Sequence, residues 1–382
     1  MIEWASEILM NSDGSLNFDV LSAIVFVLVM GILLYRHRDK VVVQRVLSLP
    51  KAFLKLPIIY LLLVRTKYGL GLIERIATRH REKVKLFGFC SIGIGFLGMF
   101  VILFSMLFSV YLIFFRPEVQ NTGVSVVLPF TNVPGLGYLS FWHFIISIFL
   151  LALVHELAHG VVARAHGLPV KSSGIGVISI FLPLIPVAFV EPEEKKMQKK
   201  PDIVQYSIFS AGPVINIVFA FVAILILSMV FTPLEDRMTE PVGFSYTITN
   251  SSLPAAQAGM SDGIIDSING MEVEHFSDFQ TQMICKVPGD TVEIGTGNRT
   301  FALTTAESED GRAIVGITAQ QNERRFKEEY AGISKAFSWL KGLFRWLFNL
   351  NLAIGLVNLL PIPIVDGGRM VQIANAKIIE DK

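Results

Sequence analysis

The sequence is poor in cysteine and in charge. Its 382 residues include only two cysteines, Cys90 and Cys285, which lie far apart, so neither a disulfide framework nor a cysteine metal cluster is supported. Charged residues make up 17% of the chain, against about 25% in soluble domains, whereas 52% of the residues are hydrophobic. Acids and bases nearly cancel, which removes the basic signature of nucleic-acid binding. Any metal must therefore be held by histidine and carboxylate, and the apolar excess points to a lipid bilayer.

Long runs with few or no charges supply this apolar excess. A bilayer core about 30 Å thick needs roughly 20 apolar helical residues. Five runs reach or approach this length and are expected to span the membrane, at 18–35, 86–115, 139–163, 206–231 and 336–365. The sequence therefore predicts a multi-pass α-helical membrane protein with about five or six spans.

Two further apolar segments are not expected to span. Segment 56–64 is too short and is flanked by Lys55 and Arg65, so it is expected at the membrane surface. Segment 175–190 is uncharged but interrupted by Gly176, Pro183 and Pro186, which disfavours a regular helix. Non-helical backbone survives at membrane depth only where protein or water satisfies its polar groups. We therefore expect a re-entrant, β-like loop bordering a site.

Basic residues are distributed unevenly among the connections. Residues 36–85 hold 13 Lys and Arg against three acids, whereas residues 1–17 hold no Lys or Arg. By the positive-inside rule the 36–85 connection is cytoplasmic and the N-terminus is outside, most simply in a cell membrane. With alternating spans, connection 164–205 is again cytoplasmic and connection 232–335 lies outside.

Connection 232–335 has the composition of a soluble domain. Residues 241–320 hold ten acids and three bases, with short strands expected at 244–249 and 291–294 and a helix at 277–284. We therefore expect four regions: an N-terminal membrane helix with a basic cytoplasmic and interfacial region (1–85), a membrane core (86–231), an inserted small α/β domain with linkers (232–335), and a last membrane segment with a C-terminal tail (336–382).

The third expected span carries the sequence HELAH at 155–159. On a helix, His155 and His159 lie on the same face, so both imidazoles can reach one ion. Zinc accepts histidine nitrogen and carboxylate oxygen and leaves a position for water, which Glu156 could deprotonate as a general base. Burying these groups in an apolar run costs several kcal/mol unless they are paired, hydrated or metal-bound, and this location favours a functional site over a chance match.

A third ligand must come from elsewhere in the chain. Asp366 follows the last apolar run, where Pro361 and Pro363 deny a helix its regular hydrogen bonds and Gly367 and Gly368 allow close backbone approach. These features would let Asp366 turn toward a site in the cytoplasmic half of the membrane. The alternative is that Asp366 only caps a helix at the interface.

Taken together, these residues resemble the site-2 protease family of intramembrane zinc metalloproteases. The resemblance rests on three stretches in matching order, HELAHG at 155–160, SAGP at 210–213 with Asn216 following, and NLLPIPIVDGG at 358–368. It implies hydrolysis of a peptide bond within a membrane-spanning protein substrate, as in regulated intramembrane proteolysis. It also implies a zinc ion held by His155, His159 and Asp366, with Glu156 as general base.

The resemblance extends to supporting residues. Asn358 matches the family asparagine thought to contact the substrate backbone or oxyanion. Asn216, with Gly212 and Pro213, matches a Gly-Pro-x-x-Asn pattern expected to support the site, although an amide that only bridges helices is the alternative. Loop 174–190 corresponds to the family's membrane-embedded β-like loop, whose edge could pair with an unwound substrate.

The inserted domain resembles a PDZ domain in the sequences LPAAQAGM at 253–260 and IIDSING at 264–270. It departs from the pattern because Gly263-Ile264-Ile265-Asp266 replaces Gly-Asp-x-Ile. It also lacks a clear Gly-Leu-Gly-Phe loop, for which Val242-Gly243-Phe244 is the nearest candidate. Binding of a peptide ligand and filtering of substrates by size therefore both stay open.

Two other classes of function remain. A non-catalytic membrane scaffold or receptor would use the metal structurally and bind partners through the inserted domain. Structural zinc sites normally have four protein ligands, and only three good candidates are found. A metal transporter would need a path of intramembrane acids, of which the sequence offers few.

Overall fold

The computed structural model describes residues 17–48, 57–116, 127–133, 135–180, 182–297 and 299–380. The chain divides into two compact units, residues 1–227 with 341–382 and residues 228–340. Residues 1–16, which make up nearly all of the N-terminal stretch without Lys or Arg, lie outside the described residues.

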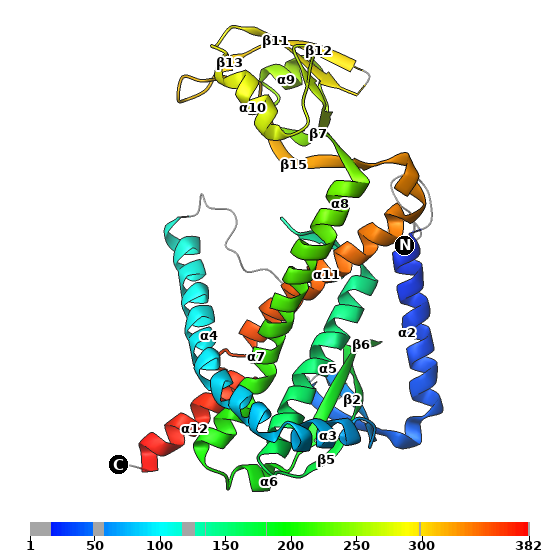
Figure 1. Ribbon diagram of the computed structural model, residues 1–382, viewed down its shortest axis with the longest axis vertical. Helices are drawn as coiled ribbons and strands as arrows, with labels where there is room; N and C mark the ends of the chain where they lie inside the picture. The colour runs from blue at the N-terminus through cyan, green and yellow to red at the C-terminus, as the bar shows by residue number, and fades with distance from the viewer. Residues whose placement is uncertain are drawn as a thin grey trace. The chain divides into compact units, whose positions relative to one another are not determined.

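Five helices in the described part of the chain are long and apolar enough to cross a membrane. They are α2 (Phe18–Arg36), α4 (Arg81–Phe115), α5 (Phe141–Ala165), the helix formed by α7 (Asp202–Ile226) with a π-helical turn (Leu227–Phe231) and α8 (Thr232–Met238), and α11 (Ala331–Val357) (Figure 1). Their lengths and compositions agree with the expected multi-pass helical fold.

The last of these helices ends earlier than the apolar run in the sequence. α11 stops at Val357, and a series of tight turns leads to α12 (Asp366–Glu380). The physical reason is that Pro361 and Pro363 lack the backbone donors a helix needs. Asp366 therefore begins a new helix and does not close a span that reaches residue 365.

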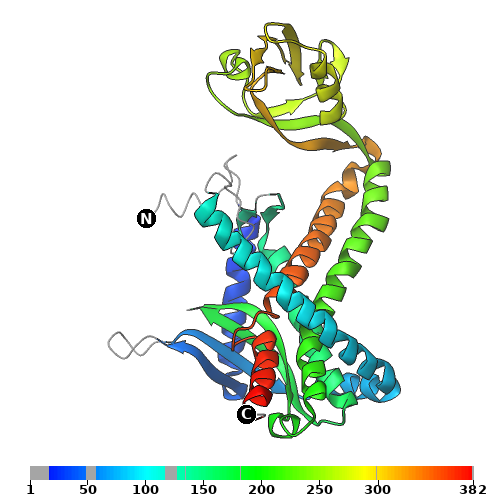
Figure 2. The same cartoon turned by 90° about the vertical axis from the view of Figure 1, so that its left-hand side faces the viewer.

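The first unit also contains a four-stranded antiparallel sheet in the order β1-β2-β5-β6. Its strands are β1 (Val41–Ser48), β2 (Pro57–Thr66), β5 (Val170–Ile180) and β6 (Leu182–Pro192). In Figure 2 the blue strands β1 and β2 lie beside the green strands β5 and β6. Segment 56–64, expected only as a surface segment, thus forms most of β2 and pairs with β5. Segment 175–190 forms a β-hairpin with an open edge on β6, which also packs along α5.

Shorter elements complete the first unit. They are a 3-10 turn (Arg38–Lys40), α3 (Leu70–Arg79), β3 (Thr131–Val133), β4 (Gly137–Leu139) and α6 (Glu194–Met197). One buried cluster joins four of the helices and the turn before α12, through Met99 of α4, Val162 of α5, Ile208 of α7, Leu359 of the turn and Met370 of α12. This packing holds α5, α7 and the start of α12 together.

The second unit has two small sheets and the short helices α9 and α10 around its own core. The sheets have the orders β15-β7-β8 and β10-β9-β11-β12, and a separate pair joins β13 to β14. The elements are β7 (Thr239–Ile248), α9 (Pro254–Gln257), β8 (Gly263–Ile265), β9 (Ser267–Ile268), β10 (Met271–Glu272), α10 (Phe276–Ile284), β11 (Thr291–Thr296), β12 (Arg299–Thr304), β13 (Ala306–Glu307), β14 (Ala313–Ile314), β15 (Ile317–Phe326) and a 3-10 turn (Glu328–Tyr330).

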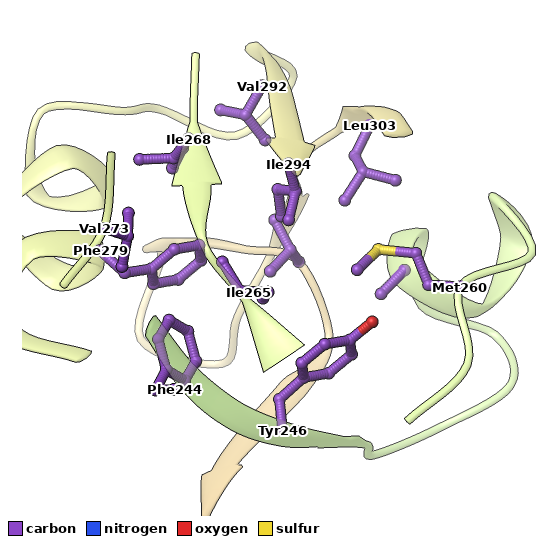
Figure 3. Close-up of a cluster of buried hydrophobic side chains, with 12 residues drawn as sticks. Phe244, Tyr246, Met260, Ile265, Ile268, Val273, Phe279, Val292, Ile294 and Leu303 are labelled. Carbon is purple, nitrogen blue, oxygen red and sulfur yellow. The ribbon is translucent and has the colours of Figure 1, made fainter. Parts of the chain in front are cut away.

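The core of this unit is apolar and closely packed. Phe244, Ile265, Ile268 and Ile294 are fully buried in it (Figure 3). The ring of Phe279 on α10 lies 5.3 Å from the ring of Phe244. The expected helix at 277–284 and strands at 244–249 and 291–294 correspond to α10, β7 and β11, each with shifted ends. The unit is therefore a small α/β domain with a core of its own.

Candidate active site

Helix α5 brings two histidines of the HELAH sequence onto its buried face. Ser140 caps the start of the helix, because its hydroxyl accepts a hydrogen bond from the backbone N–H of His143, and the helix is apolar through most of its length. His155 and His159 lie one turn apart and are 8% and 9% exposed. Their Nε2 atoms are 3.0 Å apart, so both rings point to the same place.

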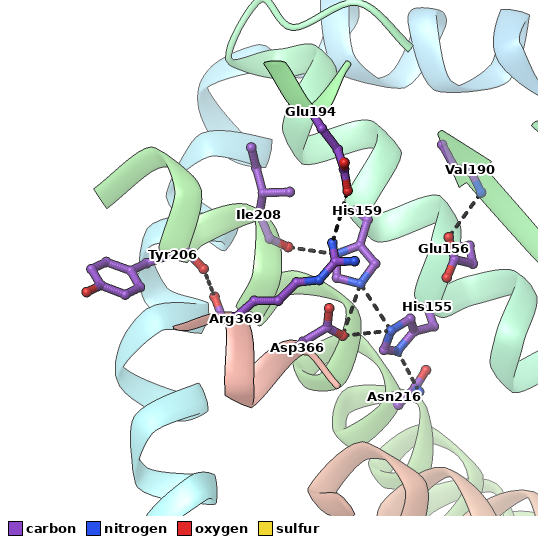
Figure 4. A network of polar contacts seen from close by, with 11 residues as sticks. His155, Glu156, His159, Val190, Glu194, Tyr206, Ile208, Asn216, Asp366 and Arg369 are labelled. Atoms are coloured by element: carbon purple, nitrogen blue, oxygen red, sulfur yellow. Dashed lines mark hydrogen bonds and ion pairs between the residues drawn. The ribbon is translucent and has the colours of Figure 1, made fainter. Parts of the chain in front are cut away.

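Asp366 reaches these histidines from the far end of the chain. The N–H of Gly367 donates to the carbonyl of Asn358 at 2.8 Å, which folds the segment between them back on itself. Gly367 has no room for a side chain there, since a Cβ would lie 2.2 Å from the carbonyl oxygen of Leu359. The Oδ2 atom of Asp366 then lies 3.1 Å from Nε2 of His155 and 3.3 Å from Nε2 of His159 (Figure 4).

The three side chains fit a zinc ion in chemistry and in spacing. Their ligand atoms, two imidazole nitrogens and one carboxylate oxygen, lie 3.0 to 3.3 Å from one another. A tetrahedral zinc site with bonds of about 2.0–2.1 Å has ligand atoms about 3.3–3.4 Å apart. The observed triangle is therefore close to one face of such a tetrahedron.

Gly212 of α7 leaves room beside this triangle. A Cβ at this position would lie 2.3 Å from Nε2 of His159 and 2.7 Å from Nε2 of His155, closer than real atoms approach. Because glycine carries no side chain, both nitrogens can pack directly against the backbone of α7 at this point. The adjoining Pro213 is buried within α7, and its carbonyl lies close to Gly355 of α11.

The protonation of His159 is set by its neighbour on α7. Its Nδ1 atom lies 2.7 Å from the carbonyl oxygen of Ile208. A carbonyl can only accept a hydrogen bond, so Nδ1 carries the proton and Nε2 of the neutral ring keeps its lone pair. That lone pair points into the triangle, as metal ligation by a histidine requires.

Glu156 lies beside the triangle and is not one of its three members. Its Oε2 atom accepts a hydrogen bond of 3.0 Å from the backbone N–H of Val190 on β6. Since Val190 uses this N–H outside the β5–β6 ladder, the outer edge of β6 faces Glu156. The backbone groups of Ala188 and Pro186, at two-residue intervals from Val190, face the same outer edge of β6. A proline is tolerated at position 186 because an N–H there would point away from β5 and would take no part in the β5–β6 pairing.

The remaining expected residues contact the site in different ways. Asn216 on α7 is fully buried, and its Nδ2 atom lies 3.1 Å from Nδ1 of His155. Asn358 takes part through its backbone carbonyl, and its half-buried side chain lies on the turn that leads to Asp366. His143 is buried near Gly342 at the other end of α5 and is not part of the site.

Three groups near the site were not anticipated from the sequence. Ile208 and Val190 act through a backbone carbonyl and a backbone N–H, which every residue type but proline offers, so no residue pattern could have revealed them. Arg369 on α12 lies over the ring of Phe209, with its guanidinium 3.8 Å from Glu194 of α6. The sequence indicates a place for Arg369 near the site only through its position, one helical turn after Asp366.

Comparison with known proteins places these features in a wider context. The family model described as "Peptidase family M50" matches residues 143–382. An uncharacterized protein of Methanocaldococcus jannaschii is 29% identical over 315 residues, which cover 80% of this chain and 75% of that protein. The zinc metalloprotease RasP of Shouchella clausii is 23% identical over 232 residues, which cover 48% of this chain and 54% of that protein.

Among solved structures, the PDZ domain of an SdrC-like protein from Listeria monocytogenes is similar to part of the chain. The match is 24% identical and covers 20% of this chain and 87% of the PDZ domain, with a TM-score of 0.19.

Proposed function

This chain belongs to peptidase family M50, the family of the site-2 proteases, and we propose that it is a zinc-dependent intramembrane endopeptidase. Its substrates would be other membrane proteins, cleaved within a membrane-spanning segment. The observation that carries the proposal is the convergence of His155, His159 and Asp366, since three zinc-type ligands meet and two of them lie on a helix apolar enough to cross a bilayer. Such groups are costly to bury in lipid without a function.

In this proposal the two histidines and Asp366 hold the metal. When bound, zinc supplies Lewis-acid activation of a water molecule and of the scissile carbonyl. Glu156 takes the proton that the attacking water loses and delivers it to the amide nitrogen of the leaving chain, as the C–N bond breaks. Its position beside the triangle suits this role, because it stays close to the ligands without using its carboxylate as one.

The substrate would bind as an added strand along the open edge of β6. A helix must unwind before its peptide bonds can be attacked, and an exposed strand edge offers backbone partners to the unwound chain. Because Glu156 is hydrogen-bonded to Val190 on that edge, a strand paired near Ala188 would pass close to the general base. Asn358 would then contact the substrate backbone or the oxyanion, and Gly212, Pro213 and Asn216 would support the ligands.

The active site would lie toward the cytoplasmic side. His155 and His159 lie nearer the C-terminal end of α5, and the connection that follows is rich in lysine. In the same topology the N-terminus and the inserted domain lie outside the cell membrane.

A direct test uses the general base, because changing it should leave the metal site intact. Membranes from cells that make the wild-type protein and membranes from cells that make Glu156→Gln would be compared by quantitative proteomics. We expect one or more full-length membrane proteins to accumulate with the variant, and these would name the substrate. Identical membrane proteomes together with no cleavage of any transmembrane peptide by the purified wild type would contradict the protease assignment and favour a scaffold.

A further inference from the structure

Helix α7 contacts both histidines of the triangle at regular intervals. Ile208, Gly212 and Asn216 are spaced by four positions, so they form one stripe along α7. Opposite them, His159 and His155 are spaced by four positions on α5. The carbonyl of Ile208 faces Nδ1 of His159, and the amide of Asn216 faces Nδ1 of His155 (Figure 4). Gly212 lies between them and faces both Nε2 atoms.

The contact at His159 has a defined direction, whereas the contact at His155 does not. The carbonyl of Ile208 can only accept, but the side chain of Asn216 carries both an acceptor oxygen and a donor nitrogen. Nδ2 faces Nδ1 of His155 at 3.1 Å, while Oδ1 is buried and has no hydrogen-bond partner among the described residues. Half a turn of the amide exchanges these two atoms with almost no change of shape.

The two orientations have opposite consequences for the metal triangle. If Nδ2 donates to Nδ1, the proton of neutral His155 must lie on Nε2, and that nitrogen then has no lone pair for a metal. If Oδ1 accepts from Nδ1–H, the lone pair of Nε2 points at Asp366 and His159 and is free to ligate. Either orientation pairs one amide atom of Asn216 with His155 and leaves the other amide atom buried without a partner among the described residues, so the choice between them rests on the lone pair that a metal requires.

We infer that Oδ1 of Asn216 accepts the Nδ1–H bond of His155, and that Asn216 is thereby a positioning residue for the metal. This inference rests on the proposed zinc site. Asn216 would fix the tautomer and the ring orientation of His155, as the Ile208 carbonyl does for His159. The surroundings hold the amide in place, since Asn216 is fully buried and its Cβ packs close to Gly355 of α11.

Two substitutions of Asn216, both similar in size to asparagine, distinguish a hydrogen bond that the side chain accepts from one that it donates. Asn216→Asp keeps an acceptor oxygen and loses the donor, whereas Asn216→Leu loses both. The control is Asn351→Leu, which removes an equally buried asparagine that bonds within its own helix to the carbonyl of Leu347. The zinc dissociation constant of each purified full-length protein in detergent would be measured by competition with a chelator, after gel filtration shows that it is folded.

We expect Asn216→Leu to weaken zinc binding by about 10- to 100-fold, the usual effect of losing a partner of a ligand histidine, and Asn216→Asp and Asn351→Leu to stay within about threefold of wild type. The visible spectrum of the cobalt(II)-substituted protein should be retained in Asn216→Asp and altered in Asn216→Leu. A residue that only fills space would leave both readouts of Asn216→Leu unchanged.

Several results would overturn the inference. Wild-type zinc affinity in Asn216→Leu would do so, and so would an Asn216→Asp variant that loses as much affinity as Asn216→Leu, because donation would then be the contact that matters. If Asn216→Leu does not fold, loss of zinc from a folded Asn216→Asp is by itself decisive. A different failure, equal zinc binding by wild type and His155→Ala, would overturn the metal site itself and with it the proposed function.

Discussion

The carboxylate of Glu156 accepts a hydrogen bond of 3.0 Å from the backbone N–H of Val190, and so ties the acid of the HELAH sequence to the open edge of β6. This contact joins two parts of the proposed reaction, because the group that would move the proton is anchored on the strand that would align the substrate. The two partners can be changed separately by mutation, since Glu156 contributes its side chain to the contact and Val190 contributes only its backbone N–H.

Replacing Glu156 by Gln should abolish cleavage while the metal site survives. Glutamine has nearly the same shape but cannot take a proton, and the loss of a general base typically lowers a rate by about 100- to 10,000-fold. The measurement is the cleavage rate of a transmembrane peptide in detergent or vesicles, together with elemental analysis for zinc. A variant of full activity would remove Glu156 from the mechanism.

Replacing Val190 by Pro should lower activity because the N–H that holds Glu156 disappears. The sheet should tolerate this proline, since the lost N–H points to the open edge and not into the ladder with β5. We expect roughly a tenfold loss, in line with the removal of one hydrogen bond to a charged group. In a double-mutant cycle, adding Val190→Pro to Glu156→Gln should cause little further loss; fully additive losses would show that the two groups act independently.

Replacing Asp366 by Asn should weaken zinc retention sharply. The amide is uncharged and a poorer ligand than a carboxylate. Loss of a residue that only supports a ligand typically weakens metal binding by about 10- to 100-fold. We therefore expect the zinc dissociation constant to rise by at least about tenfold when a ligand itself is replaced. Zinc content after dialysis against a chelator measures this. Glu194→Gln is a matched control, because that acid pairs with Arg369 nearby but does not belong to the triangle. Equal zinc content in Asp366→Asn and wild type would exclude Asp366 as a ligand.

Replacing Gly212 by Ala should remove metal binding without unfolding the protein. The new methyl group would lie 2.3 Å from Nε2 of His159, so the histidines or α7 must move. The control is Gly93→Ala on α4, where a Cβ meets nothing within 4 Å and the higher helix propensity of alanine should be harmless. Zinc titration of both variants decides the matter, and a Gly212→Ala protein that binds zinc normally would show that the space beside the histidines is not needed.

Much of the fold could be predicted because the signals are local. Each apolar run long enough to span a bilayer appears as a helix, and the HELAH sequence lies inside one of them. Pro361 and Pro363 disfavour a regular helix there, whereas the apolar composition predicts one continuous segment to residue 365. The structure ends α11 at Val357 instead.

Other features could not be predicted because they depend on partners far away in the chain. Segment 56–64 has the composition of an interfacial segment, and residues 57–64 form a strand through pairing with β1 and with β5, which lies more than a hundred residues later. Ile208 and Val190 contact the site through backbone groups, which do not depend on the side chain, so the residue type gives no indication of these contacts. The orientation of the Asn216 amide likewise depends on which atom of His155 faces it.

By itself the sequence determined which segments are long and apolar enough to cross a membrane and which residue types are available for a metal, since hydrophobic length and the helical repeat are properties of short stretches. It also determined the family, through three motifs that stand in a fixed order. Tertiary structure alone decided that Asp366 meets two histidines 211 and 207 residues earlier in the chain. It also decided that α7 faces these histidines with the carbonyl of Ile208, with Gly212, which has no side chain, and with the amide of Asn216. These relations arise from packing, because the distances between ligand atoms depend on how α5, α7 and α12 fit together.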